Sequence, residues 1–252
     1  MAIAYILAHF DDEYFATPLI RRLVDMQAEQ KFLYLADYAS PAHSARRMAE
    51  TRAYLADLGV PPENVIHVGA GSGALDGAVH RHLPRLRDLL AGELARMGEV
   101  DRLIVTAWEG GHMDHDVCAA LAVAVSDGAP VEQFSLYNGP RLPGRLFRAG
   151  APLAENGPPI RVRLSLPAWL AFAAGVRRFP SQTRTWLGLW PAMFATHLAR
   201  GFGYQSLRPA RVTERPHAGP LLYERMYGVP YAEIAEAIRT AWPAGSPGSP
   251  PA

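Results

Sequence analysis

The first 138 residues alternate short apolar runs with segments whose apolar residues recur every three or four positions. The runs predict strands at 2–8, 31–37, 64–69, 101–107 and 132–138. The periodic segments predict helices at 17–30, 40–59, 78–97 and 114–126. Strands that alternate with helices are typical of a parallel sheet. We therefore predict an α/β fold, a Rossmann-like doubly wound, mostly parallel sheet with strand order 3-2-1-4-5 and helices on both faces.

The pattern loosens after residue 138. Residues 139–160 hold five of the 22 prolines, which favours a long irregular loop. Beyond it the sequence predicts a strand at 160–164, helices at 166–177 and 181–200, and short strands at 210–214 and 220–224. We predict one domain over 1–240, with a core at 1–138 and a C-terminal loop, helix and strand extension at 139–240 that lines the substrate site. Residues 241–252, which are rich in Pro, Gly and Ser, predict a disordered tail.

Composition and charge argue against several kinds of partner. The formal net charge is +1 and the 25 basic residues are spread along the chain, so neither nucleic acid nor an acidic membrane is expected as an electrostatic partner. No uncharged apolar stretch reaches the ~18 residues of a membrane-spanning helix, so no integral membrane segment is expected. Two apolar, Trp-bearing segments at 164–176 and 185–199 could lie at a membrane interface, although core or lid helices are the favoured interpretation. The sequence does not indicate the oligomeric state.

The cellular location is predicted from cysteine usage. Cys118 is the single cysteine, so no intramolecular disulfide can form, and the N-terminus lacks the pattern of a secretory signal. Both features favour the cytoplasm. Lys31 is the single lysine among the 25 basic residues, which favours a bacterial, GC-rich genome.

Two polar clusters follow strands that are neighbours in the predicted sheet. "AHFDDE" at 8–13 follows the first strand, and "GGHMDH" at 110–115 follows the fourth. The two clusters should therefore meet at the switch point of the sheet. His9, Asp12 and His115 supply three ligands of the types that catalytic zinc uses, and Fe²⁺ or another divalent metal would accept them too. The alternative is an ordinary polar rim.

The neighbours of these three residues suggest catalytic roles. Asp11 lies beside the predicted ligands and is suited to act as general base toward a metal-bound water. His112 could stabilise an oxyanion or donate a proton, and Asp114 could keep its ring charged and oriented through a hydrogen bond from a ring N–H.

The paired motifs "AHFDDE" and "GGHMDH" resemble the AHPDDE and HxDH signatures of the PIG-L or LmbE-like zinc deacetylases. That family includes N-acetylglucosaminyl-phosphatidylinositol de-N-acetylase and the deacetylases of mycothiol, bacillithiol and glycopeptide antibiotic pathways. The resemblance covers roughly residues 1–130. It implies zinc on His9, Asp12 and His115, Asp11 as base, and His112 with Asp114 as the oxyanion pair. It also implies that the substrate is a small N-acylated sugar or sugar conjugate.

Weaker likenesses to the same family suggest substrate contacts. They are the segment "RRMAETRAYLADLGV" around Arg47, "LDG" with Asp76, and "FPSQ" with Ser181 and Gln182. Arg47 could instead form a surface ion pair with Glu50.

Phe10 stands where the family has proline, and it is a further candidate for the substrate site. Together with Trp169 and Trp186 it would favour a substrate with an apolar aglycone, if these side chains face the cleft and do not simply fill the core.

The sequence therefore predicts a metal-dependent hydrolase that removes an N-acyl group, most simply N-acetyl, from an amino sugar or its conjugate. A metal-dependent esterase or other amidase with the same site is the alternative among enzymes. A catalytically silent binding protein of the same fold is the alternative outside them.

Overall fold

The centre of the molecule is a seven-stranded sheet. A computed structural model describes residues 1–242. The spatial order of the strands is β3 (Val65–His67), β2 (Glu29–Tyr34), β1 (Ala2–Leu7), β4 (Arg102–Thr106), β5 (Val131–Phe134), β9 (Phe202–Ser206) and β8 (Ile160–Val162). The first five strands are parallel, and β9 and β8 are antiparallel to their neighbours. The predicted α/β fold and the order 3-2-1-4-5 are confirmed.

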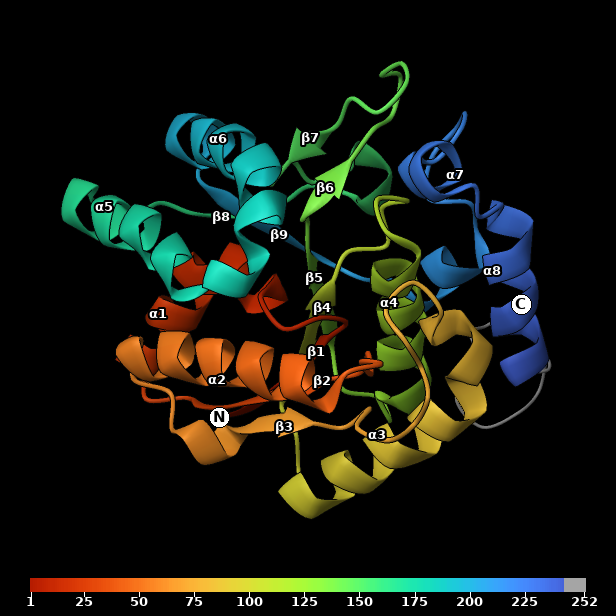
Figure 1. The fold of residues 1–252 in the computed structure, drawn as a ribbon, viewed down its shortest axis with the longest axis horizontal. Helices are drawn as coiled ribbons and strands as arrows, with labels where there is room; N and C mark the ends of the chain where they lie inside the picture. Colours follow the sequence, from red (N-terminus) through yellow and green to blue (C-terminus); the bar gives the residue numbers. More distant parts are fainter. Residues whose placement is uncertain (243–252) are drawn as a thin grey trace.

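Helices cover both faces of this sheet (Figure 1). One apolar core includes residues of α3 (Leu83–Met97), α4 (Met113–Val125) and α8 (Tyr231–Ala241). The other includes residues of α1 (Thr17–Asp25), α2 (Pro41–Asp57), α5 (Leu166–Gly175) and α6 (Thr183–Arg200). β1 serves both cores because successive side chains point to opposite faces: Ala4 and Ile6 belong to the first core, and Tyr5 and Leu7 to the second.

The C-terminal part differs from the sequence prediction in several elements. The strands predicted at 210–214 and 220–224 are wrong: Pro209–Thr213 is a 3-10 helix and Leu222–Tyr227 is helix α7. A carboxylate oxygen of Glu224 accepts the Leu221 N–H at 2.7 Å, which caps the first turn of α7. On the side away from β4, β5 pairs with Phe202–Ser206, a strand that the pattern did not single out.

Two predicted boundaries also differ from the structure, one in the strand at 132–138 and one at the start of the tail. The strand predicted at 132–138 is divided into β5 and a short β6 (Tyr137–Asn138), which pairs with β7 (Arg148–Ala149). Helix α8, which the sequence pattern did not predict, continues to Ala241, and Trp242 is buried, so the predicted disordered tail begins too early. The rest of that tail, 243–252, lies outside the described residues. None of the helices within 1–242 is long and apolar enough to cross a bilayer.

Candidate active site

A cavity of about 250 Å³ lies at the carboxyl ends of β1 and β4. Because these strands are adjacent, the segments that follow them converge there, as the sequence predicts for a switch point. Its lining comes from both halves of the chain: His9, Asp11, Asp12, Phe15, Arg47, Asp76, His112, His115, Leu136, Tyr137, Gln182, Thr185, Trp186, Leu189 and Tyr227.

Two glycines allow the turn between β4 and α4. Gly110 has a φ of 69°, which glycine adopts without steric cost. A Cβ on Gly111 would come within 1.9 Å of the Tyr137 carbonyl oxygen. The pair "GG" therefore lets this turn pass close to the segment after β5 and places His112 at the start of α4.

His9, Asp12 and His115 point to one place. One candidate ligand atom from each lies within 4.8 Å of the others, and Nε2 of His115 is 3.2 Å from Oδ1 of Asp12. His115 is 2% exposed; its Nδ1 has no hydrogen-bond partner among the described residues, and its Nε2 faces the Asp12 carboxylate without a well-formed hydrogen bond. Buried polar groups that are poorly paired are costly, and a cation bound between them would remove that cost. The three residues fit a divalent metal ion.

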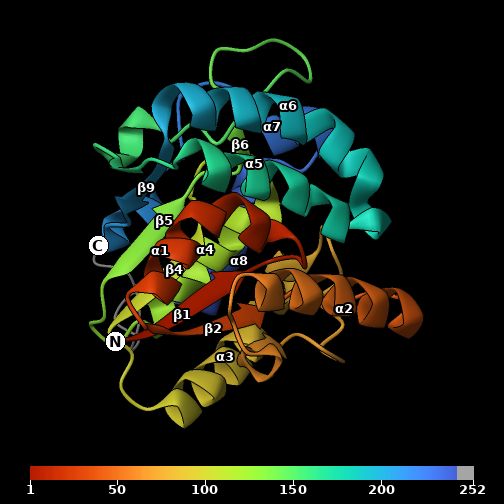
Figure 2. The ribbon, with the colours of Figure 1, turned by 90° about the vertical axis from the view of Figure 1, so that its left-hand side faces the viewer.

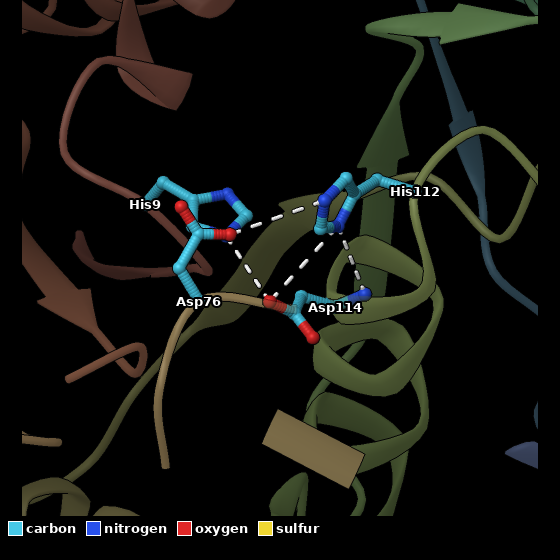
Figure 3. Close-up of side chains that lie close together, drawn as sticks. All are labelled: His9, Asp76, His112 and Asp114. Carbon is cyan, nitrogen blue, oxygen red and sulfur yellow. Dashed lines mark hydrogen bonds and ion pairs between the residues drawn. The ribbon is translucent and has the colours of Figure 1, made fainter. Parts of the chain in front are cut away.

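A second group of possible ligands adjoins the first. It consists of His9, Asp76, His112 and Asp114 and shares His9 with the first group (Figure 3). Nε2 of His9 lies 3.1 Å from Asp76 and 3.2 Å from Asp114. These carboxylates raise the pKa of His9 against the opposing effect of its burial. A carboxylate at the far nitrogen of a ligating histidine commonly fixes the orientation of the ring.

Asp11 is held in an unusual backbone conformation beside this centre. Its φ is 106°, in the left-handed region that residues other than glycine rarely occupy. The Asp11 N–H donates to the buried Glu13 carboxylate at 3.0 Å, and the hydroxyl of Tyr34 donates to the same oxygen at 2.9 Å. Arg47 donates to Oδ1 of Asp11 at 3.0 Å and also to the Phe10 carbonyl. Burial raises the pKa of Asp11 to about 7, and the Arg47 guanidinium opposes that rise.

His112 has a defined proton position. Its Nδ1 accepts the backbone N–H of Asp114 at 3.2 Å (Figure 3). Burial lowers the pKa of His112 to about 4, so its ring is neutral at pH 7. With Nδ1 as acceptor, the proton of the neutral ring is on Nε2. His112 therefore offers an N–H donor in the wall of the cavity.

The carboxylate of Asp114 does not orient His112 as predicted, and it does not keep the ring charged, because burial holds the pKa of His112 at about 4. It lies 4.0 Å from Nδ1 of His112, whereas it is 3.2 Å from Nε2 of His9. It also accepts the N–H groups of Gly77 and Val79, at 2.6 and 3.2 Å. His112 is therefore held by the backbone N–H of Asp114 and not by its carboxylate. Its carboxylate instead positions His9 and the loop that carries Asp76.

Comparison with known proteins agrees with this geometry. Residues 4–126 match the model of the PIG-L family, described as GlcNAc-PI de-N-acetylase. This segment of the chain belongs to the PIG-L family. It contains both motifs and all the residues described above at the ends of β1 and β4. No curated protein matches the sequence significantly.

Several solved structures share the fold of this chain. A deacetylase of teicoplanin biosynthesis is 16% identical, with a TM-score of 0.60 over 82% of this chain and 97% of its own. The zinc-inhibited form of teicoplanin deacetylase gives 16% identity and a TM-score of 0.59 over the same shares. The N,N'-diacetylchitobiose deacetylase of Pyrococcus horikoshii is 16% identical, with a TM-score of 0.56 over 82% of this chain and 83% of its own.

The structure separates the predicted substrate residues into those that line the cavity and one that does not. Asp76 and Gln182 line the cavity, as does Arg47, whose partner is Asp11 and not Glu50. Ser181 is absent from the lining and donates its hydroxyl to Glu50 at 2.6 Å. This bond ties α2 to the start of α6, next to Gln182.

The predicted aromatic contacts are divided between the cavity and the core. Phe10 is 1% exposed, packs against Tyr34, stacks on Tyr38 and does not line the cavity, so a substrate contact is not supported for it. Trp186 lines the cavity. Trp169 packs against Phe194 in the core between α5 and α6.

Sequence reasoning missed several residues that shape the candidate site, among them two tyrosines and a buried acid. Tyr137 and Tyr227 line the cavity, and the rings of Tyr227 and His112 have centroids 5.2 Å apart. Glu109 is buried behind them, and burial raises the pKa of its carboxyl. It accepts from the Ser135 hydroxyl, the backbone N–H groups of 136 and 137, and the Asn138 amide, at 2.5 to 2.9 Å. The signal available in the sequence was an acidic residue directly before "GGHMDH". Its hydrogen-bond partners could not be found in the same way, because they are distant in sequence.

We expect Glu109→Ala to lower the free energy of unfolding by about 3 kcal/mol or more. Removal of the carboxylate leaves several buried donors unpaired, at a cost of about 1–3 kcal/mol each. Urea unfolding of the variant and the parent measures the difference. Glu99→Ala, at an exposed position, is the matched control. A loss no greater than that of the control would contradict an organising role for Glu109.

Proposed function

We propose that this chain is a metal-dependent hydrolase that removes an N-acyl group, most simply N-acetyl, from an amino sugar or amino-sugar conjugate. The observation that carries the proposal is the position of Asp11. Its carboxylate is fixed by Arg47 in a cavity whose wall also contains His9, Asp12 and His115. A base beside a candidate metal centre is what hydrolysis requires, whereas a binding protein of the same fold would have no use for it.

Zn²⁺ suits the set of donors best. Two imidazoles and one carboxylate are a common set of catalytic zinc ligands, and Fe²⁺ accepts the same groups. When bound, such an ion would lower the pKa of a water molecule and polarise the scissile carbonyl.

Residues of this chain would then carry out the proton transfers and stabilise the developing negative charge. Asp11 accepts the proton of the attacking water, and Arg47 keeps the accepting carboxylate in place. The N–H at Nε2 of His112 donates a hydrogen bond to the oxygen on which negative charge develops. Asp11 then returns a proton to the departing amine, so that acetate and a free amino group are formed.

The walls of the cavity suit an amino sugar. Asp76 and Gln182 offer hydrogen-bonding groups to sugar hydroxyls, and Phe15, Trp186 and Leu189 form an apolar side. Deacetylases of teicoplanin biosynthesis and of N,N'-diacetylchitobiose share the fold, and their substrates are consistent with this class.

Acetate release from a panel of N-acetylated sugars and conjugates tests the proposed function. The purified protein, loaded with one metal at a time, is assayed with N-acetylglucosamine, N,N'-diacetylchitobiose and aryl N-acetylglucosaminides. O-acetylated analogues of the same sugars distinguish an esterase. Hydrolysis of the O-acetyl compounds alone, or of no compound with any metal, would reject the N-deacetylase.

Replacement of Arg47 tests the positioning of the base. We expect Arg47→Met to lower kcat about 10- to 100-fold, because a charge-assisted hydrogen bond to a buried group is worth about 1.5–3 kcal/mol. The metal content should not change, since Arg47 is not among the candidate ligands. Arg46→Met, on the exposed side of the same helix, is the control. Equal kcat for the two variants would show that Arg47 does not contribute to the reaction.

A further inference from the structure

Charge is distributed very unevenly along this chain. Residues 156–213 contain no aspartate or glutamate, although the chain has 24 acidic residues. The same segment contains Arg161, Arg163, Arg177, Arg178, Arg184, Arg200, Arg208 and Arg211. A formal net charge of +1 for the whole chain conceals this local excess of positive charge. Helices α5 and α6 belong to this segment.

These two helices expose large apolar side chains to solvent. Leu166 and Leu170 of α5 are 66% and 54% exposed, and Leu187 and Leu198 of α6 are 74% and 65% exposed. Helix α5 has no charged residue from end to end. On α6 the exposed positions 187, 191, 195 and 198 share one side of the helix and are all apolar. Exposed leucines are ordinary when scattered, but four on neighbouring helices form a surface.

The exposed side of α6 lies opposite its functional side. Thr185, Trp186 and Leu189 line the catalytic cavity, and the helical repeat turns 187, 191, 195 and 198 away from it. Helices α5 and α6 lie next to each other at the periphery of the molecule (Figures 1 and 2). They are joined by contacts of Phe194 with Trp169 and Phe172, at centroid distances of 5.3 and 5.1 Å. No other element between 1 and 242 removes the four leucines from solvent.

Arginines flank this surface at the ends of both helices. Arg163 precedes α5 and Arg177 follows it, while Arg184 and Arg200 lie near the two ends of α6. All four are exposed, and none forms an ion pair within the described part of the chain. An apolar helix face with arginines at its borders is typical of helices that lie in the headgroup region of a bilayer, where long basic side chains reach the phosphates.

We propose that the surface formed by α5 and α6 docks onto an anionic lipid bilayer, with its leucines in the interface and its arginines at the headgroups. Leu166 and Leu198 also border a cavity of about 320 Å³, lined further by Trp169, Phe202 and Arg163, which offers apolar room beside the same face. A second copy of this face is a poorer partner, because a two-fold contact would bring arginines toward arginines. The inference rests on exposure and charge and is independent of the proposed deacetylation.

Vesicle flotation of the full chain tests the docking surface. The lipids are phosphatidylcholine alone and phosphatidylcholine with about 30% phosphatidylglycerol. We expect binding to the anionic vesicles that weakens as salt is added, and little binding to phosphatidylcholine. Leu187→Asp combined with Leu198→Asp should lower the bound fraction at least tenfold. Arg184→Gln combined with Arg200→Gln should reduce binding and its dependence on salt.

Leu89→Asp is the matched control, because Leu89 is an exposed leucine on α3, far from α5 in Figure 1. None of the substituted residues lines the catalytic cavity, so hydrolysis of a small water-soluble substrate should not change. Absence of parent protein from the anionic vesicles at low salt would overturn the proposal. So would equal losses in the control and in the leucine variant. A third outcome would assign the surface to a second copy of the chain instead. In that case the parent self-associates and does not bind vesicles, and the leucine variant is monomeric.

Discussion

Asp11→Asn is expected to lose most of its turnover while it keeps its metal. The amide is nearly the same size as the carboxylate but cannot accept a proton from water at neutral pH. General acid–base assistance contributes about 100- to 10,000-fold to rate, and kcat should fall by a factor in that range. Initial rates of acetate release, measured at equal metal loading, give the comparison.

A control separates this effect from damage to the fold. Asp25→Asn makes the same chemical change at an exposed position near the end of α1 and should leave kcat unchanged. Asp11 itself has a left-handed φ, which asparagine tolerates better than most residues, so the variant should fold normally. Near-parental turnover of Asp11→Asn would show that another group is the base.

His115→Ala should abolish both metal retention and activity. His115 is the one member of the first group that comes from α4, so its removal leaves His9 and Asp12, which both follow β1. Two ligands bind a divalent ion far more weakly than the usual three. Metal analysis after dialysis should show about one ion per chain in the parent and little in the variant.

The same substitution at an exposed histidine provides the comparison. His43→Ala on α2 should retain metal and activity, because His43 does not line the cavity. The stability of His115→Ala is informative as well. Without metal, His115 makes no well-formed side-chain hydrogen bond and has only the Asp12 carboxylate beside it, so its loss should cost little and the variant should be about as stable as the metal-free parent. Equal metal content in His115→Ala and the parent would reject the proposed centre.

Much of the fold follows from local patterns. Alternation of apolar runs with helical periodicity predicts β1 to β5 and their parallel order, because a strand buried on both faces must be apolar throughout. The same patterns failed after residue 200. Short apolar segments near 212 and 222 have strand-like composition, but the only free position beside β5 is taken by Phe202–Ser206. Which segment occupies a sheet edge depends on tertiary packing, and composition does not record it.

The sequence by itself determined where the candidate chemistry lies. His9, Asp11 and Asp12 are neighbours in one motif and His115 belongs to another, and both motifs follow adjacent strands, so their meeting follows from strand order. Only the tertiary structure decided which groups hold these residues. Arg47 pairs with Asp11, Asp114 with His9, and Ser181 with Glu50. Those partners are 36, 105 and 131 positions apart. A hydrogen bond depends on fractions of an ångström between side chains, and such distances are set by the packing of whole helices rather than by the spacing of residues along the chain.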